Sequence, residues 1–224
     1  MKNKSTILVL PKKMQTKFLI FDCDGVLVDT EAISTRVLAE EARKLGTNLS
    51  DEEALDVFAG TSYDFVFSFI EKRLGKSLPT NFEDIYRKRT FQEFEKNLQP
   101  IPGIHGVVKK LQIPFCVASN APAYKVDFNL KLVNLFPFFE GKIFSAYQVN
   151  AWKPDPTLFL IAAKTFGFQP EECLVVEDSP SGVQAAVAGG MRVLGYANSD
   201  AKAKKLASHG AIVIRDLSEI FDYI

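Results

Sequence analysis

The 224-residue chain carries 27 basic and 27 acidic side chains, which gives a formal net charge of zero at pH 7. A balanced charge provides no overall attraction to nucleic acid or to an acidic membrane surface, so we expect neither as a partner. Apolar residues account for 47% of the sequence, a share typical of a packed globular protein and too high for a disordered one.

The N-terminal segment and the cysteines bear on cellular location. Met1–Thr16 contains a run of only four apolar residues before Pro11, too short for a secretory leader, and we expect a flexible extension. No stretch of the chain approaches the roughly 18 apolar residues that a membrane-spanning helix needs. Cys23, Cys116 and Cys173 lie in or beside apolar runs without the paired spacing of zinc ligands. We interpret them as buried thiols of a protein in the reducing cytoplasm.

After Lys17, short apolar runs alternate with segments of helical periodicity. The run Phe18–Phe21 stops abruptly at Asp22, as a strand buried on both faces does. Later runs cover Ile113–Ala118, Lys142–Ala146, Cys173–Val176, Arg192–Tyr196 and Ala211–Ile214, and helical segments cover Pro122–Val133, Thr157–Phe166 and Ser179–Gly190. Because alternating strands and helices are joined by right-handed crossovers, we predict an α/β fold with a doubly wound parallel sheet.

The segment between Thr30 and Pro100 interrupts this alternation. Its periodicity predicts successive helices and no strand, at Glu31–Leu45, Asp51–Phe58, Tyr63–Leu74 and Phe82–Asn97. An inserted helical cap is the economical explanation. We therefore expect an N-terminal extension at 1–16, an α/β core at 17–30 and 100–224, and a cap at 31–99.

Two carboxylates stand at the end of the first predicted strand. Asp22 and Asp24 flank Cys23, and the period of two along a strand points both the same way. Such a pair suits phosphoryl transfer, in which one carboxylate attacks phosphorus and the other delivers a proton to the leaving oxygen. We assign Asp22 as the nucleophile and Asp24 as the general acid and base.

Three further segments supply complementary groups. Ser119 and Asn120 precede a helix, where a hydroxyl and backbone N–H groups can hold a phosphate oxygen. Lys153 lies in a proline-rich loop, where a fixed ammonium would neutralise charge on the phosphoryl oxygens. Glu177 and Asp178 follow the strand Cys173–Val176 and offer hard oxygen atoms of the kind that Mg²⁺ prefers.

The candidate ligands of Mg²⁺ are Asp22, the backbone carbonyl of Asp24, and Asp178, with Glu177 as a direct ligand or as a partner of one. Each segment alone has an ordinary explanation, such as a turn, a helix cap or a solvated lysine. Together they favour a catalytic site, because parallel strands bring their carboxyl ends to one edge of the sheet.

These segments resemble the four motifs of the haloacid dehalogenase superfamily. The matching stretches are Phe21–Thr30, Ala118–Asn120, Lys153–Pro156 and Val176–Ser179. The resemblance spans Lys17 to about Ile214 and implies a helical cap on a Rossmann-like core. It also implies a magnesium-dependent phosphatase that forms an aspartyl phosphate on Asp22 and binds a small phosphate ester.

Differences between this chain and particular branches of the superfamily make some of its activities less favoured than others. Asp24 resembles the phosphatases and mutases, whereas dehalogenases lack a carboxylate at that position. Sugar-phosphate mutases often carry a histidine and a cap arginine where this chain aligns Ser34 and Tyr63. Hydrolysis is therefore favoured, with a mutase similar to beta-phosphoglucomutase as one alternative and a non-catalytic phospholigand-binding protein as another.

The stretch Phe115–Pro156 resembles bacterial phosphatases of 6-phosphogluconate and related sugar phosphates. A carboxylate on such a substrate suits a bidentate arginine, and Arg36, or else Arg87 and Arg89, is our candidate. We expect Gly60 and Thr61 in the cap to meet the substrate. The sequence does not indicate an oligomeric state.

Other features have structural interpretations. Phe65, Phe69, Phe91 and Phe94 recur at helical spacing, which predicts a cap core rather than a substrate pocket. Lys202, Lys204 and Lys205 are interpreted as a solvated helix face.

Overall fold

The computed structural model describes residues 15–58, 61 and 63–224. In this part of the chain, six parallel strands form one sheet in the order β3-β2-β1-β4-β5-β6. Their bounds are β1 Phe18–Phe21, β2 Phe115–Ser119, β3 Ile143–Ser145, β4 Cys173–Glu177, β5 Arg192–Tyr196 and β6 Ile212–Ile214. The predicted doubly wound parallel sheet is confirmed.

The central strand β1 is buried on both faces, which explains its continuous apolar sequence. Leu19 and Phe21 belong to one hydrophobic cluster, whereas Phe18 and Ile20 belong to a second cluster on the opposite face. This division follows from the period of two along a strand. A strand covered on both sides needs apolar residues at every position, so the core is apolar up to Asp22.

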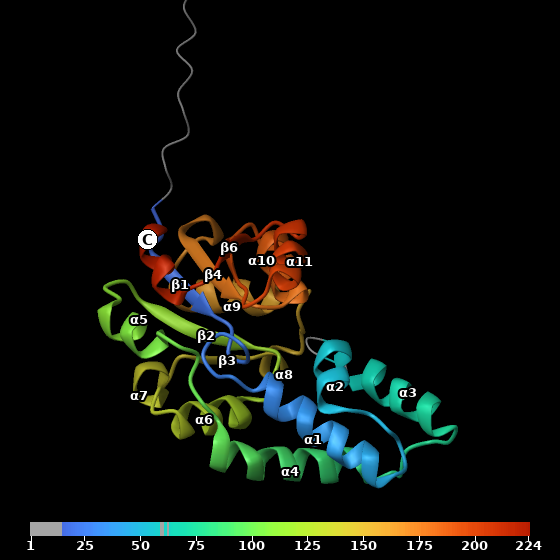
Figure 1. The fold of residues 1–224 in the computed structure, drawn as a ribbon. Helices are drawn as coiled ribbons and strands as arrows, with labels where there is room; N and C mark the ends of the chain where they lie inside the picture. The colour runs from blue at the N-terminus through green and yellow to red at the C-terminus, as the bar shows by residue number, and fades with distance from the viewer. Residues whose placement is uncertain (1–14, 59–60, 62) are drawn as a thin grey trace, which may run out of the picture.

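Helices cover both faces of the sheet (Figure 1). On one face lie α5 Ile104–Lys110, α6 Ala123–Leu132, α7 Phe136–Phe139 and the 3-10 helix Leu217–Asp222. On the other lie α8 Ala146–Val149, α9 Thr157–Thr165, α10 Pro180–Ala188 and α11 Asp200–Ser208. A further 3-10 helix, Pro170–Glu172, leads into β4.

A separate group of helices projects from the sheet (Figure 1). It comprises α1 Glu31–Lys44, α2 Asp51–Phe58, α3 Tyr63–Leu74 and α4 Phe82–Asn97. These helices share a hydrophobic cluster of their own, which includes Val37, Ile70 and Tyr86. The two chain segments that lead in and out lie side by side, because Val28 forms an antiparallel bridge with Pro100.

The aromatic residues of this helical group do not form the single cap core that we predicted. Phe94 belongs to the cluster of the sheet, and Phe91 packs on α6, with its ring centroid 5.0 Å from that of Phe128. Phe65 is about half exposed, with its ring centroid 6.4 Å from that of Phe69, and Phe69 packs against the cap cluster. Helical spacing reveals that one face is apolar but not which neighbour covers it.

The predicted N-terminal extension is one residue too long. Thr16 is buried, and its hydroxyl donates a hydrogen bond to the backbone oxygen of Tyr223 at 2.6 Å. Thr16 also hydrogen-bonds with Arg192, so it belongs to the packed domain. The prediction for residues 1–14 lies outside the described residues. Among the helices that the structure describes, none combines the length and apolarity that crossing a bilayer requires.

The core depends on aromatic packing beside the central strand. Phe139 is fully buried, with its ring edge-on to Phe21 and Phe115 at centroid distances of 6.1 and 5.3 Å. We expect Phe139→Ala to lower the free energy of unfolding by about 3–5 kcal/mol, because removal of the ring leaves a cavity. Urea denaturation measures this loss. The half-buried neighbour Phe138 is the control, and equal losses for Phe138→Ala and Phe139→Ala would contradict the prediction.

Candidate active site

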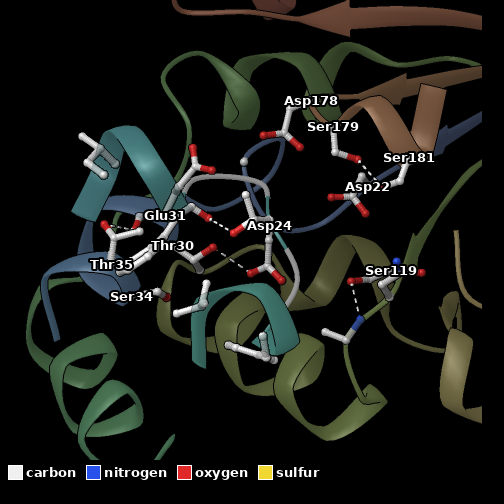
Figure 2. Close-up of a pocket in the computed structure, with 18 of the residues that line it drawn as sticks. Asp22, Asp24, Thr30, Glu31, Ser34, Thr35, Ser119, Asp178, Ser179 and Ser181 are labelled. Carbon is white, nitrogen blue, oxygen red and sulfur yellow. Dashed lines mark hydrogen bonds between the residues drawn. The ribbon is translucent and has the colours of Figure 1, made fainter. Parts of the chain in front are cut away.

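The carboxyl ends of β1, β2 and β4 open onto a pocket of about 790 Å³ between the sheet and the cap helices. Figure 2 shows the side chains of Asp22, Asp24, Ser119 and Asp178 around this pocket. They come from segments far apart in the sequence. The structure thus places residues of the four predicted segments at one edge of the sheet, as expected for a parallel α/β fold.

Lys153 lies at the floor of the pocket and is almost fully buried. Its Nζ donates hydrogen bonds to Asp22 Oδ1 at 2.5 Å, Glu177 Oε1 at 2.7 Å and the backbone oxygen of Ala118 at 2.8 Å. Burial alone would lower the pKa of Lys153, but the adjacent carboxylates raise it above its ordinary value. All three ammonium protons are therefore used, and the charge is fixed in place.

Asn120 holds the backbone of the Lys153 loop. Its Oδ1 accepts a hydrogen bond from the Lys153 N–H at 2.9 Å. Ser119 is buried, and its Oγ accepts a hydrogen bond from the Ala121 N–H at 3.1 Å. Both residues line the pocket, so they remain available as candidate phosphate contacts, and Asn120 also positions the lysine loop.

Glu177 is fully buried and accepts four hydrogen bonds. Its Oε2 accepts from the backbone N–H groups of Asp178 and Ser179 and from the Ser179 hydroxyl, at 2.9, 3.0 and 2.9 Å. Its other oxygen is held by Lys153. This oxygen, Oε1, accepts one hydrogen bond and keeps a further lone pair. Both expectations for Glu177 therefore stay open, as a direct ligand of a metal or as a residue that orients Lys153 and Asp178.

Asp22, Glu177 and Asp178 each offer an oxygen atom within 4.8 Å of the others. Burial, opposed by the Lys153 ammonium and reinforced by Glu177 and Asp178, raises the pKa of Asp22 well above its usual range. Burial and the charge of Glu177, opposed by Lys202, raise the pKa of Asp178 to about 7. Crowded hard oxygens whose ionised forms need a positive charge fit a divalent cation.

Asp24 faces a different part of the pocket. Its Oδ1 accepts a hydrogen bond from Thr30 Oγ1 at 2.9 Å, and its Oδ2 accepts from Lys125 Nζ at 3.0 Å. Figure 2 shows the bond from Thr30. Among the described residues, the Asp24 carboxylate is not part of the metal-type cluster. The contribution of the Asp24 backbone oxygen to a metal site stays a prediction.

Two lysines at this site were not identified from the sequence. Lys125 lies in the first turn of α6, shortly after the Ser119–Asn120 segment. This position in the sequence could have indicated that Lys125 lies near the site. Lys202 donates to Asp178 Oδ2 at 2.6 Å. Its interpretation as part of a solvated face is therefore wrong, whereas Lys204 is exposed as expected. A helix face cannot be assigned from lysine spacing alone, because long side chains reach across neighbouring elements.

The cap residues that we expected to meet the substrate do not all line the pocket. Thr61 lines the pocket, whereas Gly60 lies outside the described residues. Arg36 does not line the pocket, because its guanidinium pairs with Glu40 and Glu93, each at 2.9 Å. This pairing corrects our expectation that Arg36 binds the substrate.

The other two candidate arginines, Arg87 and Arg89, differ in whether they line the pocket. Arg89 pairs with Glu40 and Glu41 and lies away from the pocket. Arg87 lines the pocket, with its guanidinium carbon 4.9 Å from the centre of the Tyr63 ring. Of the three arginines named from the sequence, the structure brings Arg87 to the site.

Two glycines create the space in which this cluster packs. A Cβ on Gly25, which has a φ of +81°, would lie 2.0 Å from Asp178 Oδ2. A Cβ on Gly182 would lie 1.8 Å from Glu177 Oε1. Asp178 and Glu177 can therefore approach the turn after β1 and the first turn of α10 only because these positions lack a side chain.

Known proteins share both the sequence pattern and the fold. A family model described as haloacid dehalogenase-like hydrolase matches residues 16–190. The 6-phosphogluconate phosphatase of Escherichia coli K12 is 32% identical over 203 residues, which cover 90% of this chain and 91% of that protein.

Solved structures agree with this match. A haloacid dehalogenase-like protein of Agrobacterium tumefaciens has 33% identity and a TM-score of 0.84, covering 92% of this chain and 96% of its own. A Thermotoga maritima protein provisionally assigned as a beta-phosphoglucomutase has 26% identity and a TM-score of 0.78, covering 92% and 97%.

The absent side chain at Gly182 leads to a prediction. We expect Gly182→Ala to lower the free energy of unfolding by about 1–3 kcal/mol, because the methyl group forces Glu177 out of its buried hydrogen bonds. Gly106→Ala is the matched control. Gly106 is exposed on α5, and a Cβ there would meet no heavy atom within 4 Å, so that variant should be neutral or more stable by up to about 1 kcal/mol. Equal urea denaturation midpoints for the two variants would contradict the role of Gly182.

Proposed function

Because the chain belongs to the haloacid dehalogenase-like hydrolase family, we propose that it is a magnesium-dependent phosphatase of a small sugar phosphate such as 6-phosphogluconate. The chain is a phosphoric monoester hydrolase of this family. The observation that carries the proposal is the buried Lys153 ammonium, which holds Asp22 at 2.5 Å beside the cluster of Glu177 and Asp178. This arrangement supplies a fixed carboxylate nucleophile and a place for a phosphoryl group.

In the first proposed step, an oxygen of Asp22 attacks phosphorus. Lys153 hydrogen-bonds Oδ1 and thereby orients the carboxylate, which leaves Oδ2 to form the new bond. The phosphorus–oxygen bond of the ester breaks opposite to it. Asp24, which takes up a proton from water when it leaves Lys125, gives that proton to the departing sugar oxygen. The products of this step are an aspartyl phosphate and the free sugar.

In the second step, Asp24 takes a proton from water as the water attacks the aspartyl phosphate, which releases phosphate and restores Asp22. Before the first step, Asp24 must leave Thr30 and Lys125, which hold its carboxylate away from Asp22 in this structure. Rotation of the Asp24 side chain accomplishes this change. Ser119 and Asn120 contribute donors for the phosphoryl oxygens from the neighbouring strand end.

Mg²⁺ would be held by Asp22, Asp178 and the backbone oxygen of Asp24, with Glu177 as a direct ligand or as a partner of one. When bound, it would offset the carboxylate charge and polarise the phosphoryl group. Lys202 shares Asp178 and balances part of its charge. The cap helices cover the pocket and would exclude bulk water during phosphoryl transfer. We also propose a cytoplasmic location, which the three unpaired and buried cysteines support.

A phosphate-moving mutase is the second candidate. The provisionally assigned beta-phosphoglucomutase among the structural neighbours favours it. Against it, Ser34 and Tyr63 line the pocket where a mutase carries other groups, and neither His105 nor His209 is among the lining residues. Phosphorus NMR of the products separates the two functions, because hydrolysis yields free phosphate and a mutase yields an isomeric ester.

The third candidate, a non-catalytic phospholigand-binding protein, predicts no turnover at all. A panel of sugar phosphates, nucleotides and phosphoglycolate with Mg²⁺ tests it. Release of phosphate from any of these esters by the purified chain excludes this candidate.

The nucleophile is tested by Asp22→Asn. We expect the turnover number to fall at least about 1,000-fold, because the amide neither attacks phosphorus nor carries the phosphoryl group. Phosphate release measures turnover, and intact-protein mass spectrometry measures the phosphoryl adduct. Asp127→Asn is the control, because Asp127 lies on α6 in an ion pair with Lys131 outside the pocket. Substantial turnover by Asp22→Asn would contradict the covalent mechanism.

Metal binding is tested independently of activity. We expect Mg²⁺ to raise the melting temperature, with a stabilisation of about 2.7 kcal/mol at one hundred times its dissociation constant. Asp178→Asn should remove most of this increase, because it removes a carboxylate from the cluster. Differential scanning fluorimetry at constant ionic strength gives the measurement. A rise of equal size in both proteins would argue against this metal site.

A further inference from the structure

Besides Lys153, Lys202 and Lys205, the lining of the pocket includes two cations from the helices on its cap side. Lys125 comes from α6 of the core and Arg87 from α4 of the cap, and both line the pocket. The Lys125 side chain is about one fifth exposed, and its Nζ lies 6.0 Å from the ring centre of Phe94 on α4. The two cations therefore face the same chamber between core and cap.

Tyr63 shares the pocket lining with both cations. The Arg87 guanidinium carbon lies 4.9 Å from the centre of its ring, and Tyr63 and Lys125 line the same pocket. Tyr63 also meets Tyr86, with ring centroids 5.9 Å apart. Two positive charges and two tyrosines thus belong to the lining of one pocket, which suits a polar anionic ligand.

The acidic residues of the lining lie elsewhere or are already paired. Glu31 lines a second, smaller pocket together with Gly25 and Lys202, which places it toward the metal-type cluster. Asp56 lies exposed on α2. Glu83, the ion-pair partner of Arg87, is not among the lining residues. This pair uses Arg87 Nε and Nη2, and the Tyr63 ring covers one face of the guanidinium. Among the described residues, Arg87 Nη1 has no hydrogen-bond partner, so it can donate to a second anion.

We propose that Lys125 and Arg87 form an anion subsite around Tyr63 that binds the carboxylate of a sugar-acid phosphate. This inference rests on the proposed phosphatase function and names the substrate class that the same pocket selects. Lys125 exchanges partners during the cycle. It holds Asp24 in the free enzyme and holds the substrate carboxylate when Asp24 turns toward the leaving oxygen.

The exchange explains why a carboxylated substrate is preferred. A neutral sugar phosphate leaves the largely buried Lys125 ammonium without an anionic partner when Asp24 departs. A sugar-acid phosphate replaces one carboxylate by another at the same ammonium. Selectivity then arises from the cost of an unpaired charge as well as from the new contact.

The test compares two substrates that differ only at the end distant from phosphate. 6-Phosphogluconate carries a carboxylate there, and sorbitol 6-phosphate carries a hydroxymethyl group. We expect the wild-type chain to prefer 6-phosphogluconate in kcat/KM, and Lys125→Gln to reduce that preference on the order of 10- to 100-fold. The preference is a ratio, so any effect of the substitution on Asp24 that is common to both substrates cancels.

Three further variants sharpen the result. Arg87→Gln should reduce the same ratio, and Lys125→Arg should restore most of it because the positive charge is kept. Lys131→Gln is the matched control, because Lys131 lies on the same helix in an ion pair with Asp127 outside the pocket. An unchanged ratio in Lys125→Gln, with kcat reduced equally for both substrates, would overturn the subsite and make Lys125 a positioning residue for Asp24.

A binding measurement separates failure of this inference from failure of the proposed function. Calorimetry on Asp22→Asn with Mg²⁺ should show tighter binding of 6-phosphogluconate than of sorbitol 6-phosphate, and Lys125→Gln on that background should abolish the difference. This pattern without turnover by the wild-type chain would support the subsite and refute the phosphatase. Equal binding of the two ligands would refute the subsite even if both are hydrolysed.

Discussion

The contact between Lys153 and the carboxylates of Asp22 and Glu177 determines how the rest of the site is built. An ammonium buried at the base of the pocket needs negative partners, and the carboxylates around it need positive charge, so neither would be stable there alone. Glu177 links this pair to the start of α10 through three further hydrogen bonds. The central strand, the lysine loop and the helix are thereby held in one fixed arrangement.

The same contact bears on the different roles that we propose for the two aspartates at the end of the first strand. Asp22 is fixed by Lys153, whereas Asp24 has a hydroxyl and a lysine from outside the sheet as its partners. A rigid attacking group and a movable proton carrier are what a covalent two-step hydrolysis requires. The neighbouring residues of the two carboxylates, rather than the carboxylates themselves, create the difference.

The sequence was sufficient to predict the parallel sheet and to predict which residues lie at the carboxyl ends of its strands. A strand such as Phe18–Phe21, covered on both faces, must be apolar throughout, so the first polar residue after it marks the strand end. Lys125 and Lys202 could not be predicted in the same way, because their helices follow the strands and long side chains return to the edge. Arg36 was misassigned because spacing along a helix does not show that Glu40 and Glu93 already occupy its guanidinium. Phe94 was misassigned because α4 packs on α6 as well as on the cap.

The cap helices have a hydrophobic cluster of their own, separate from the two clusters that support the sheet. Substitutions inside that cluster change the shape of the chamber without removing any side chain from beneath Asp22 or Lys153. Natural variation can therefore retune ligand preference through α2 and α3 while the reactive groups stay in place. Such a modular arrangement would let one ancestral enzyme diversify into many, each of which acquires a new substrate specificity through changes in its cap helices.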